Sequence, residues 1–220
     1  MDLYRSIPRN PCPPSIHQVT TRIHELLEKS EIPDPGLQHD VYLCQSLSLM
    51  KHLFLRDKHF GCVPLTGDIF ITEGDVERDL AFARRLGHDP SRARTLSGSI
   101  VHEIAHRLIQ HRVGFFQEHD LPVWLREGLC DYIARDSILP AREALEGILG
   151  RRSIPSSLTH GYLRRACATY LLRKEGRSID ELLDSPPLYD KIRNRVVALM
   201  ESDPEGFLSW VGENESIQTY

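Results

Sequence analysis

The stretch SIVHEIAHRL, residues 99–108, decides how the rest of the chain is interpreted. Its apolar residues recur every three or four positions, which predicts a helix over residues 98–112 with one buried stripe. That stripe consists of Ile100, Val101, Ile104, Ala105, Leu108 and Ile109. On a helical wheel, His102 and His106 lie roughly 130° from the centre of the stripe. The two histidines therefore share a face that is not the core face, and we expect it to border a cleft.

The same stretch contains the pattern His-Glu-x-x-His, formed by His102, Glu103 and His106. Histidines at positions i and i+4 of a helix can bind one Zn²⁺ ion, and the glutamate beside them can accept a proton from water on that ion. The alternative is a pair of ordinary helix histidines in a motif that arose by chance. The offset of both histidines from the apolar stripe favours the zinc interpretation.

The third ligand decides the subclass of such a site. One large group of zinc peptidases has a glycine and then a histidine at the positions that Ile109 and Arg112 occupy here, so that pattern is excluded. His111 follows too soon after the motif, and His119 falls in an expected loop. Both are therefore weak candidates for the third ligand.

Glu127 is the better candidate, because it follows the motif after twenty intervening residues and falls near the start of an expected second helix, 122–136. Gly128 beside it leaves room for close backbone approach. Asp131 lies one helical turn further on, where a carboxylate can orient a ligand histidine. The alternative for both acidic residues is a solvated acidic face.

HEIAH followed by WLREGLCDY, residues 124–132, resembles the gluzincin metallopeptidases, most closely the short peptidase MA-like and aminopeptidase-type members. The specific resemblance covers roughly residues 97–135. It implies that His102, His106 and Glu127 are zinc ligands, that Glu103 is the general base and that Asp131 supports a ligand histidine. The chain lacks the GAMEN-like segment and the large N-terminal β-domain of true aminopeptidases.

The resemblance also implies two further parts of the site. The first is a tyrosine or histidine that stabilises the oxyanion, for which Tyr162 and His160 are the candidates; a structural tyrosine at a helix start is the alternative. The second is an edge strand that binds extended substrate through its main chain. The strand Asp68–Thr72, the clearest strand signal in the chain, is expected to fill that role, or else to be a core strand.

The expected function is therefore that of a zinc-dependent peptidase acting on a peptide or protein substrate. A second hypothesis is a non-catalytic zincin-fold binding protein with a structural zinc. A third is a helical interaction protein in which the motif is accidental. An intact Glu103 favours the first, because a structural site does not need that carboxylate.

The expected fold class is α+β, zincin-like, with a small mixed sheet whose edge strand packs on the active-site helix, followed by a mainly helical half. We expect an N-terminal extension over residues 1–36 with one helix, 15–30, and a metallopeptidase domain over 37–220. Strands are expected at 40–44, 59–64 and 68–72. The remaining helices are expected at 46–56, 75–86, 140–149, 159–175, 178–184 and 187–201.

Composition limits the other possibilities. The chain has 220 residues and a net charge of −4, which gives no reason to expect nucleic acid or a membrane surface as a partner. It shows neither a signal peptide nor a long apolar run. Its five cysteines form no CxxC pair, which favours reduced thiols in a cytoplasmic protein.

Overall fold

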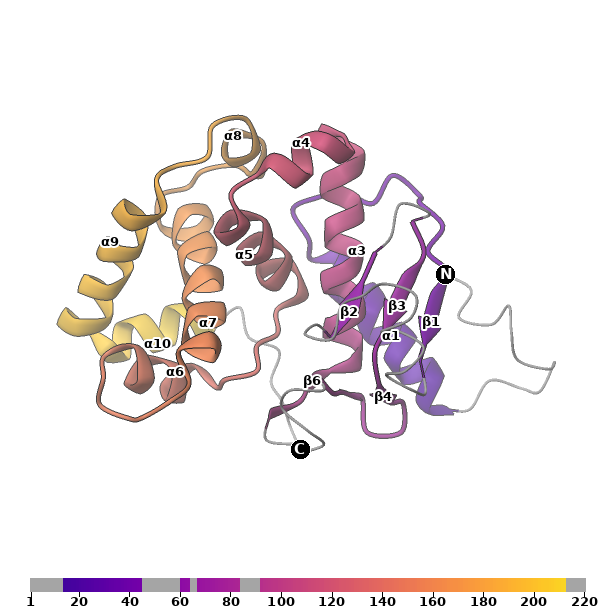
Figure 1. Ribbon diagram of the computed structural model, residues 1–220, viewed down its shortest axis with the longest axis horizontal. Coiled ribbons are helices and arrows are strands. Elements are labelled where there is room, and N and C mark those ends of the chain that lie inside the picture. Colours follow the sequence, from indigo (N-terminus) through magenta and orange to yellow (C-terminus); the bar gives the residue numbers. More distant parts are fainter. Residues whose placement is uncertain (1–13, 45–59, 64–66, 84–91, 213–220) are drawn as a thin grey trace. The chain divides into compact units, whose positions relative to one another are not determined.

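The computed structural model describes residues 14–44, 60–63, 67–83 and 92–212 (Figure 1). The expected helix 46–56 and the outer residues of the expected strand 59–64 lie outside these ranges. The chain divides into two compact units, Met1–His111 and Arg112–Tyr220. The expected boundary between residues 36 and 37 stays a prediction.

The first unit contains two small sheets. In one, β3 (Ile69–Ile71) lies between β1 (Val41–Leu43), which is parallel to it, and β2 (Gly61–Cys62), which is antiparallel. The expected mixed sheet is therefore confirmed, but the expectation that strand 68–72 is an edge strand is wrong. Ile69 and Ile71 are fully buried, as suits an apolar strand paired on both sides, so the core-strand alternative holds.

The second sheet replaces a predicted helix. A helix was expected over residues 75–86, of which 84–86 lie outside the described ranges. Over the described part the structure has a hairpin of β4 (Gly74–Asp75) and β5 (Leu80–Ala81), and β6 (Arg94–Thr95) extends it in antiparallel pairing. The Asp75 carboxylate accepts a hydrogen bond from the Arg78 backbone at 3.1 Å, and Asp79 adopts a left-handed φ of 50°. Aspartates favour turns because they form such local bonds and tolerate this conformation, so turn chemistry prevails over helical spacing here.

The hairpin also holds the start of α3 (Leu96–Val113), the predicted motif helix. The Asp79 carboxylate accepts two hydrogen bonds from Ser97, one from its backbone N–H and one from its hydroxyl, both at 2.7 Å. The Thr95 hydroxyl accepts a third from the backbone of Gly98 at 3.0 Å. These acceptors satisfy N–H groups that have no partner within the first helical turn.

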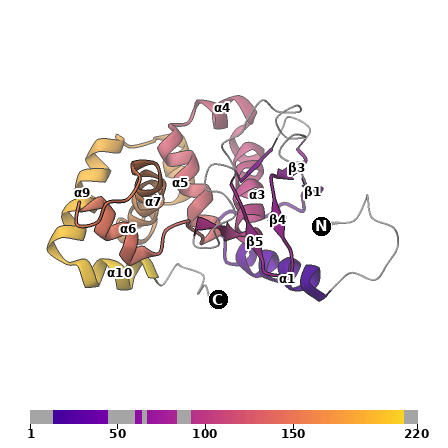
Figure 2. The same ribbon diagram turned by 60° about the horizontal axis from the view of Figure 1, so that its bottom comes forward.

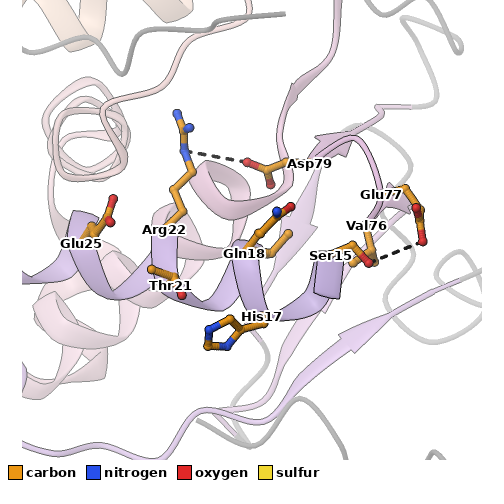
Figure 3. Close-up of a pocket in the computed structure, with 10 residues that line it drawn as sticks. Ser15, His17, Gln18, Thr21, Arg22, Glu25, Val76, Glu77 and Asp79 are labelled. Atoms are coloured by element: carbon orange, nitrogen blue, oxygen red, sulfur yellow. Dashed lines mark hydrogen bonds and ion pairs between the residues drawn. The ribbon is translucent and has the colours of Figure 1, made fainter. Parts of the chain in front are cut away.

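Helix α1 (Pro14–Glu28) confirms the expected amphipathic helix and belongs to the first unit. It buries Val19, Ile23 and Leu26. Arg22 lies 3.8 Å from the Asp79 carboxylate, so α1 also contacts the hairpin. Residues of α1 and of the β4–β5 turn line a hollow of about 370 Å³, and Figure 3 shows their side chains.

The second unit is helical. The structure confirms the helices expected at 122–136, 140–149, 159–175, 178–184 and 187–201, with small shifts at their ends. They are α5 (Val123–Ala134), α6 (Ala141–Ile148), α7 (Ser156–Thr169) with its π-helical continuation η3 (Tyr170–Lys174), α8 (Ile179–Asp184) and α9 (Tyr189–Ser202). Two helices were not expected from the sequence: α4 (Phe115–Asp120) and α10 (Pro204–Gly212). Helices α5 and α7 lie side by side in both views (Figures 1 and 2).

Local signals explain several of these helix ends. Ser178 and Glu181 form the predicted capping box at the start of α8, with hydrogen bonds of 2.8 and 3.2 Å. Gly176 follows the η3 turn with a φ of 67°, a conformation that glycine adopts easily. None of the helices in the described part of the chain has the length and apolar character that a membrane span requires.

A polar contact at the buried His39 ring holds residues 34–40 against α3. The Arg107 guanidinium donates to the Gln38 carbonyl oxygen at 2.8 Å and lies 3.0 Å from the Nδ1 atom of His39. Arginine can only donate, so Nδ1 must accept and the His39 ring must be neutral. His39 is 2% exposed, and burial together with Arg107 lowers its pKa from 6.5 to about 4.

Acid is therefore expected to destabilise the protein through His39. Between pH 6.5 and 4 the unfolded chain binds more protons at this residue than the folded chain does. The contribution of neutral His39 is thus complete above pH 6.5 and is lost as the pH falls toward 4. Between pH 7 and pH 5 the free energy of unfolding should drop by roughly 2 kcal/mol more in the parent than in His39→Gln. Urea unfolding at both pH values measures this, and an equal drop in both proteins would contradict it.

Candidate metal and catalytic site

Helix α3 brings His102 and His106 together. Their ring centroids are 5.0 Å apart with an interplanar angle of 73°, and one ligand nitrogen of each lies within 4.8 Å of the other. Two Zn–N bonds of about 2 Å each span about 4 Å, so a small ring rotation would bring both nitrogens onto one ion. The donor chemistry of this pair therefore fits zinc.

The polar face of α3 is more buried than the sequence suggests. The predicted apolar stripe is buried throughout. His102 and Glu103, however, are also buried, at 9% and 7% exposure, whereas His106 is half-buried. The sequence predicted that this face borders a cleft. In the structure the face is buried at His102 and Glu103 and becomes partly exposed only at His106. His111 is exposed on α3, and His119 lies exposed on α4 rather than in the expected loop.

Glu103 lies against strand β2. A Cβ atom placed on Gly61 would be 3.0 Å from both Cγ and Oε1 of Glu103. Sequence reasoning did not single out Gly61, because nothing in the local pattern FGCV indicates which helix approaches it. The absence of a side chain in an otherwise apolar strand was the one available signal.

Glu127 and Asp131 lie one turn apart on α5, as predicted. Glu127 has a cation beside it, since the Nε atom of Arg126 is 3.5 Å from its Oε1 and 3.6 Å from Oε1 of Glu118. Arg126 also donates to the His119 carbonyl oxygen at 3.3 Å. Arg126 therefore lies within ion-pair distance of two carboxylates of the second unit.

Cys130 is a residue that the sequence analysis left without a role. It lies on α5 three residues after Glu127, is fully buried and is not part of a disulfide. Thiolate sulfur is a common zinc ligand. Cys130 therefore joins Glu127 as a residue of α5 with metal-binding chemistry.

The two oxyanion candidates lie on α7 but on different sides of it. Tyr162 is 2% exposed, whereas His160 is exposed to solvent. Two residues that are two positions apart on a helix point in directions roughly 160° apart, so one site cannot receive both. The burial of Tyr162 fits both the oxyanion role and the alternative of a structural tyrosine.

Comparison of the chain with protein-family models, with curated proteins and with solved structures finds no match. The case for a function therefore rests on the residues of this chain. The resemblance to gluzincins stays a hypothesis about residues 97–135.

Gly128 allows the close packing of α5 against α7. A Cβ atom at this position would lie 2.6 Å from the Arg164 carbonyl oxygen and 3.4 Å from the Cβ of Ala168. The first distance is too short for any side chain, and the atom that would have to move belongs to a helix backbone. The predicted close approach at Gly128 is thus confirmed, and it fixes the helix that carries Glu127.

Gly128→Ala should consequently destabilise the second unit. Overpacking of this kind costs about 1–3 kcal/mol. Gly161→Ala is the matched control, because Gly161 lies within α7 and a Cβ there meets nothing within 4 Å. Alanine at 161 should stabilise the helix by roughly 0.5–1 kcal/mol. Urea unfolding of both variants checks this; equal effects would refute the steric account.

Proposed function

We propose that this chain is a zinc-dependent peptidase. In this proposal His102, His106 and Glu127 hold the ion, Glu103 is the general base and Asp131 orients a ligand histidine. The observation that carries the proposal is the arrangement on α3, where two histidine rings 5.0 Å apart adjoin a buried carboxylate. The spacing of WLREGLCDY after the motif supports the choice of Glu127.

Zinc held by these residues would supply Lewis acidity and a water of lowered pKa. Glu103 would accept the proton of the attacking water and pass it to the leaving amine. Its contact with β2 favours this role, since a general base must be held in a defined place. The hydroxyl of Tyr162 would donate a hydrogen bond to the developing oxyanion.

The substrate strand in this proposal is β2 rather than β3. Within the described sheet β2 is paired on one side, with β3, and the side chain of Glu103 lies against it. An extended peptide can pair with a strand that offers unpaired main-chain groups. The scissile bond would then lie near the carboxylate of Glu103.

A structural zinc without catalysis is the second candidate function, and the low exposure of His102 and Glu103 favours it. Structural zinc sites are closed by four protein ligands, whereas catalytic sites keep one position open. In the structural case Cys130 would complete the set with His102, His106 and Glu127.

Metal binding by variants distinguishes these ligand sets. His102→Ala and His106→Ala should each weaken zinc binding by more than the 10–100-fold that follows loss of a ligand's partner. Glu127→Ala should do the same, whereas Cys130→Ala should change the affinity by less than threefold. Calorimetric titration of the zinc-free protein measures these affinities. A cobalt-loaded protein with a thiolate charge-transfer band, abolished in Cys130→Ala, would support the structural site.

Glu103→Gln tests catalysis itself. The amide has nearly the same shape but cannot accept a proton from water, so zinc should stay bound while hydrolysis of a quenched-fluorescent peptide library falls by at least about 100-fold. His111→Gln is the control, because His111 is exposed on the same helix. A Glu103→Gln protein as active as the parent would rule out the general base.

A further inference from the structure

We propose that Gly61 is a positioning residue for Glu103, and that the lack of a side chain at position 61 sets where the Glu103 carboxylate lies. The inference rests on the proposed function. It adds to it a residue of β2 that neither binds metal nor moves a proton. The evidence is the contact between strand and helix.

Steric demand, and not backbone conformation, explains the glycine. Five glycines in the described part of the chain have positive φ values, and Gly61 is not among them. Any residue could therefore adopt the backbone of Gly61. A Cβ atom there would lie 2.9 Å from the Phe70 carbonyl oxygen and 3.0 Å from Cγ and Oε1 of Glu103. Real Cβ atoms essentially never have a contact below 3.0 Å, so something must shift when a side chain is placed at position 61.

Strand β2 cannot easily retreat from the helix. Gly61 pairs with Ile71 and Cys62 with Phe70 in the antiparallel ladder. The carbonyl oxygen of Phe60, next to Gly61, accepts from both the backbone N–H and the hydroxyl of Thr72, at 2.8 and 2.9 Å. The bonds at Phe60 and the strand pairing at Cys62 therefore resist the displacement of β2 that a methyl group at position 61 would cause.

Helix α3 cannot easily retreat either. Ile100 lies one turn before Glu103 and Ile104 directly follows it, and both side chains are almost completely buried. Asp79 holds the helix start through both bonds to Ser97. The Phe70 contact shifts the strand slightly whatever residue stands at position 103, and the rest of the conflict falls on the side chain of Glu103, which must give by a few tenths of an ångström. A displacement of about 1 Å in a catalytic group can cost 100-fold in rate, so a shift of this size should cost roughly 5–10-fold.

A double-mutant cycle on the full chain tests the contact. The proteins are the parent, Gly61→Ala, Glu103→Ala and the double variant, each unfolded thermally without zinc. If Glu103 causes the conflict, Gly61→Ala should lower Tm by roughly 2–4 °C less in the Glu103→Ala background than in the parent. The conflict with Phe70 is common to both arms and cancels. A parallel cycle with Glu103→Gln, which keeps the side-chain volume, should show no such relief.

Kinetics on the zinc-loaded proteins test the consequence. Gly61→Ala should lower kcat on the quenched-fluorescent peptide library by roughly 5–10-fold, with zinc affinity within threefold of the parent and little change in KM. Gly74→Ala is the matched control: a Cβ there meets Leu96 at 3.0 Å, and Glu103 is not among its neighbours. It should lower Tm, leave kcat unchanged and show no coupling to Glu103→Ala.

The outcomes separate this inference from the proposed function. An additive unfolding cycle, or a Gly61→Ala protein with the parental kcat, overturns the positioning role while the peptidase assignment stands. A parent no more active than Glu103→Gln overturns the peptidase assignment and the catalytic purpose of Gly61. The unfolding cycle then still reports whether the contact exists. Coupling together with a selective loss of kcat supports both.

Discussion

The first unit depends on one constraint: other segments of its backbone must approach helix α3 closely. Three glycines approach this helix, Gly74 at Leu96, Gly61 at Glu103 and Gly67 at Arg107. These contacted residues are spaced i, i+7 and i+11, so they lie within about 40° of one another on the helical wheel. A line of backbone contacts therefore runs along α3 between its apolar stripe and its histidines. Side chains at these three glycine positions would push the approaching backbone segments away from the helix.

That constraint determines what the polar residues of α3 can do. Arg107 lies on this line of contacts. Its guanidinium donates to the Gln38 carbonyl oxygen and to the His39 ring, and so holds residues 34–40 against the helix. Glu103 also lies on this line, where its side chain packs against β2. His102 and His106 lie beyond this line, on the side away from the apolar stripe. One helix thus places its packing residues, the arginine that holds residues 34–40 and its two histidines at different angles around its axis.

Sequence periodicity predicted the parts of this arrangement that are local. It located α3 and its buried stripe, the helix that carries Glu127, and the capping box at Ser178, because each depends on neighbours within a few residues. It assigned a helix where Asp75 and Asp79 make a hairpin, since the spacing of apolar residues outweighed two turn-forming aspartates. It made strand 68–72 an edge and overlooked Gly61, because strand order and the approach of strand to helix are long-range properties that no local pattern contains.

Burial changes along the polar face of α3. Ser99 is 2% exposed and His102 9%, His106 is half-buried, and His111 is exposed. Exposure therefore rises toward the C-terminal end of the helix. Burial of an ionisable group carries a desolvation cost that pairing or binding offsets. Along this face that cost is largest at His102 and Glu103 and smallest at His111, so the buried end of the face, and not its exposed end, constrains which residue types the helix can carry.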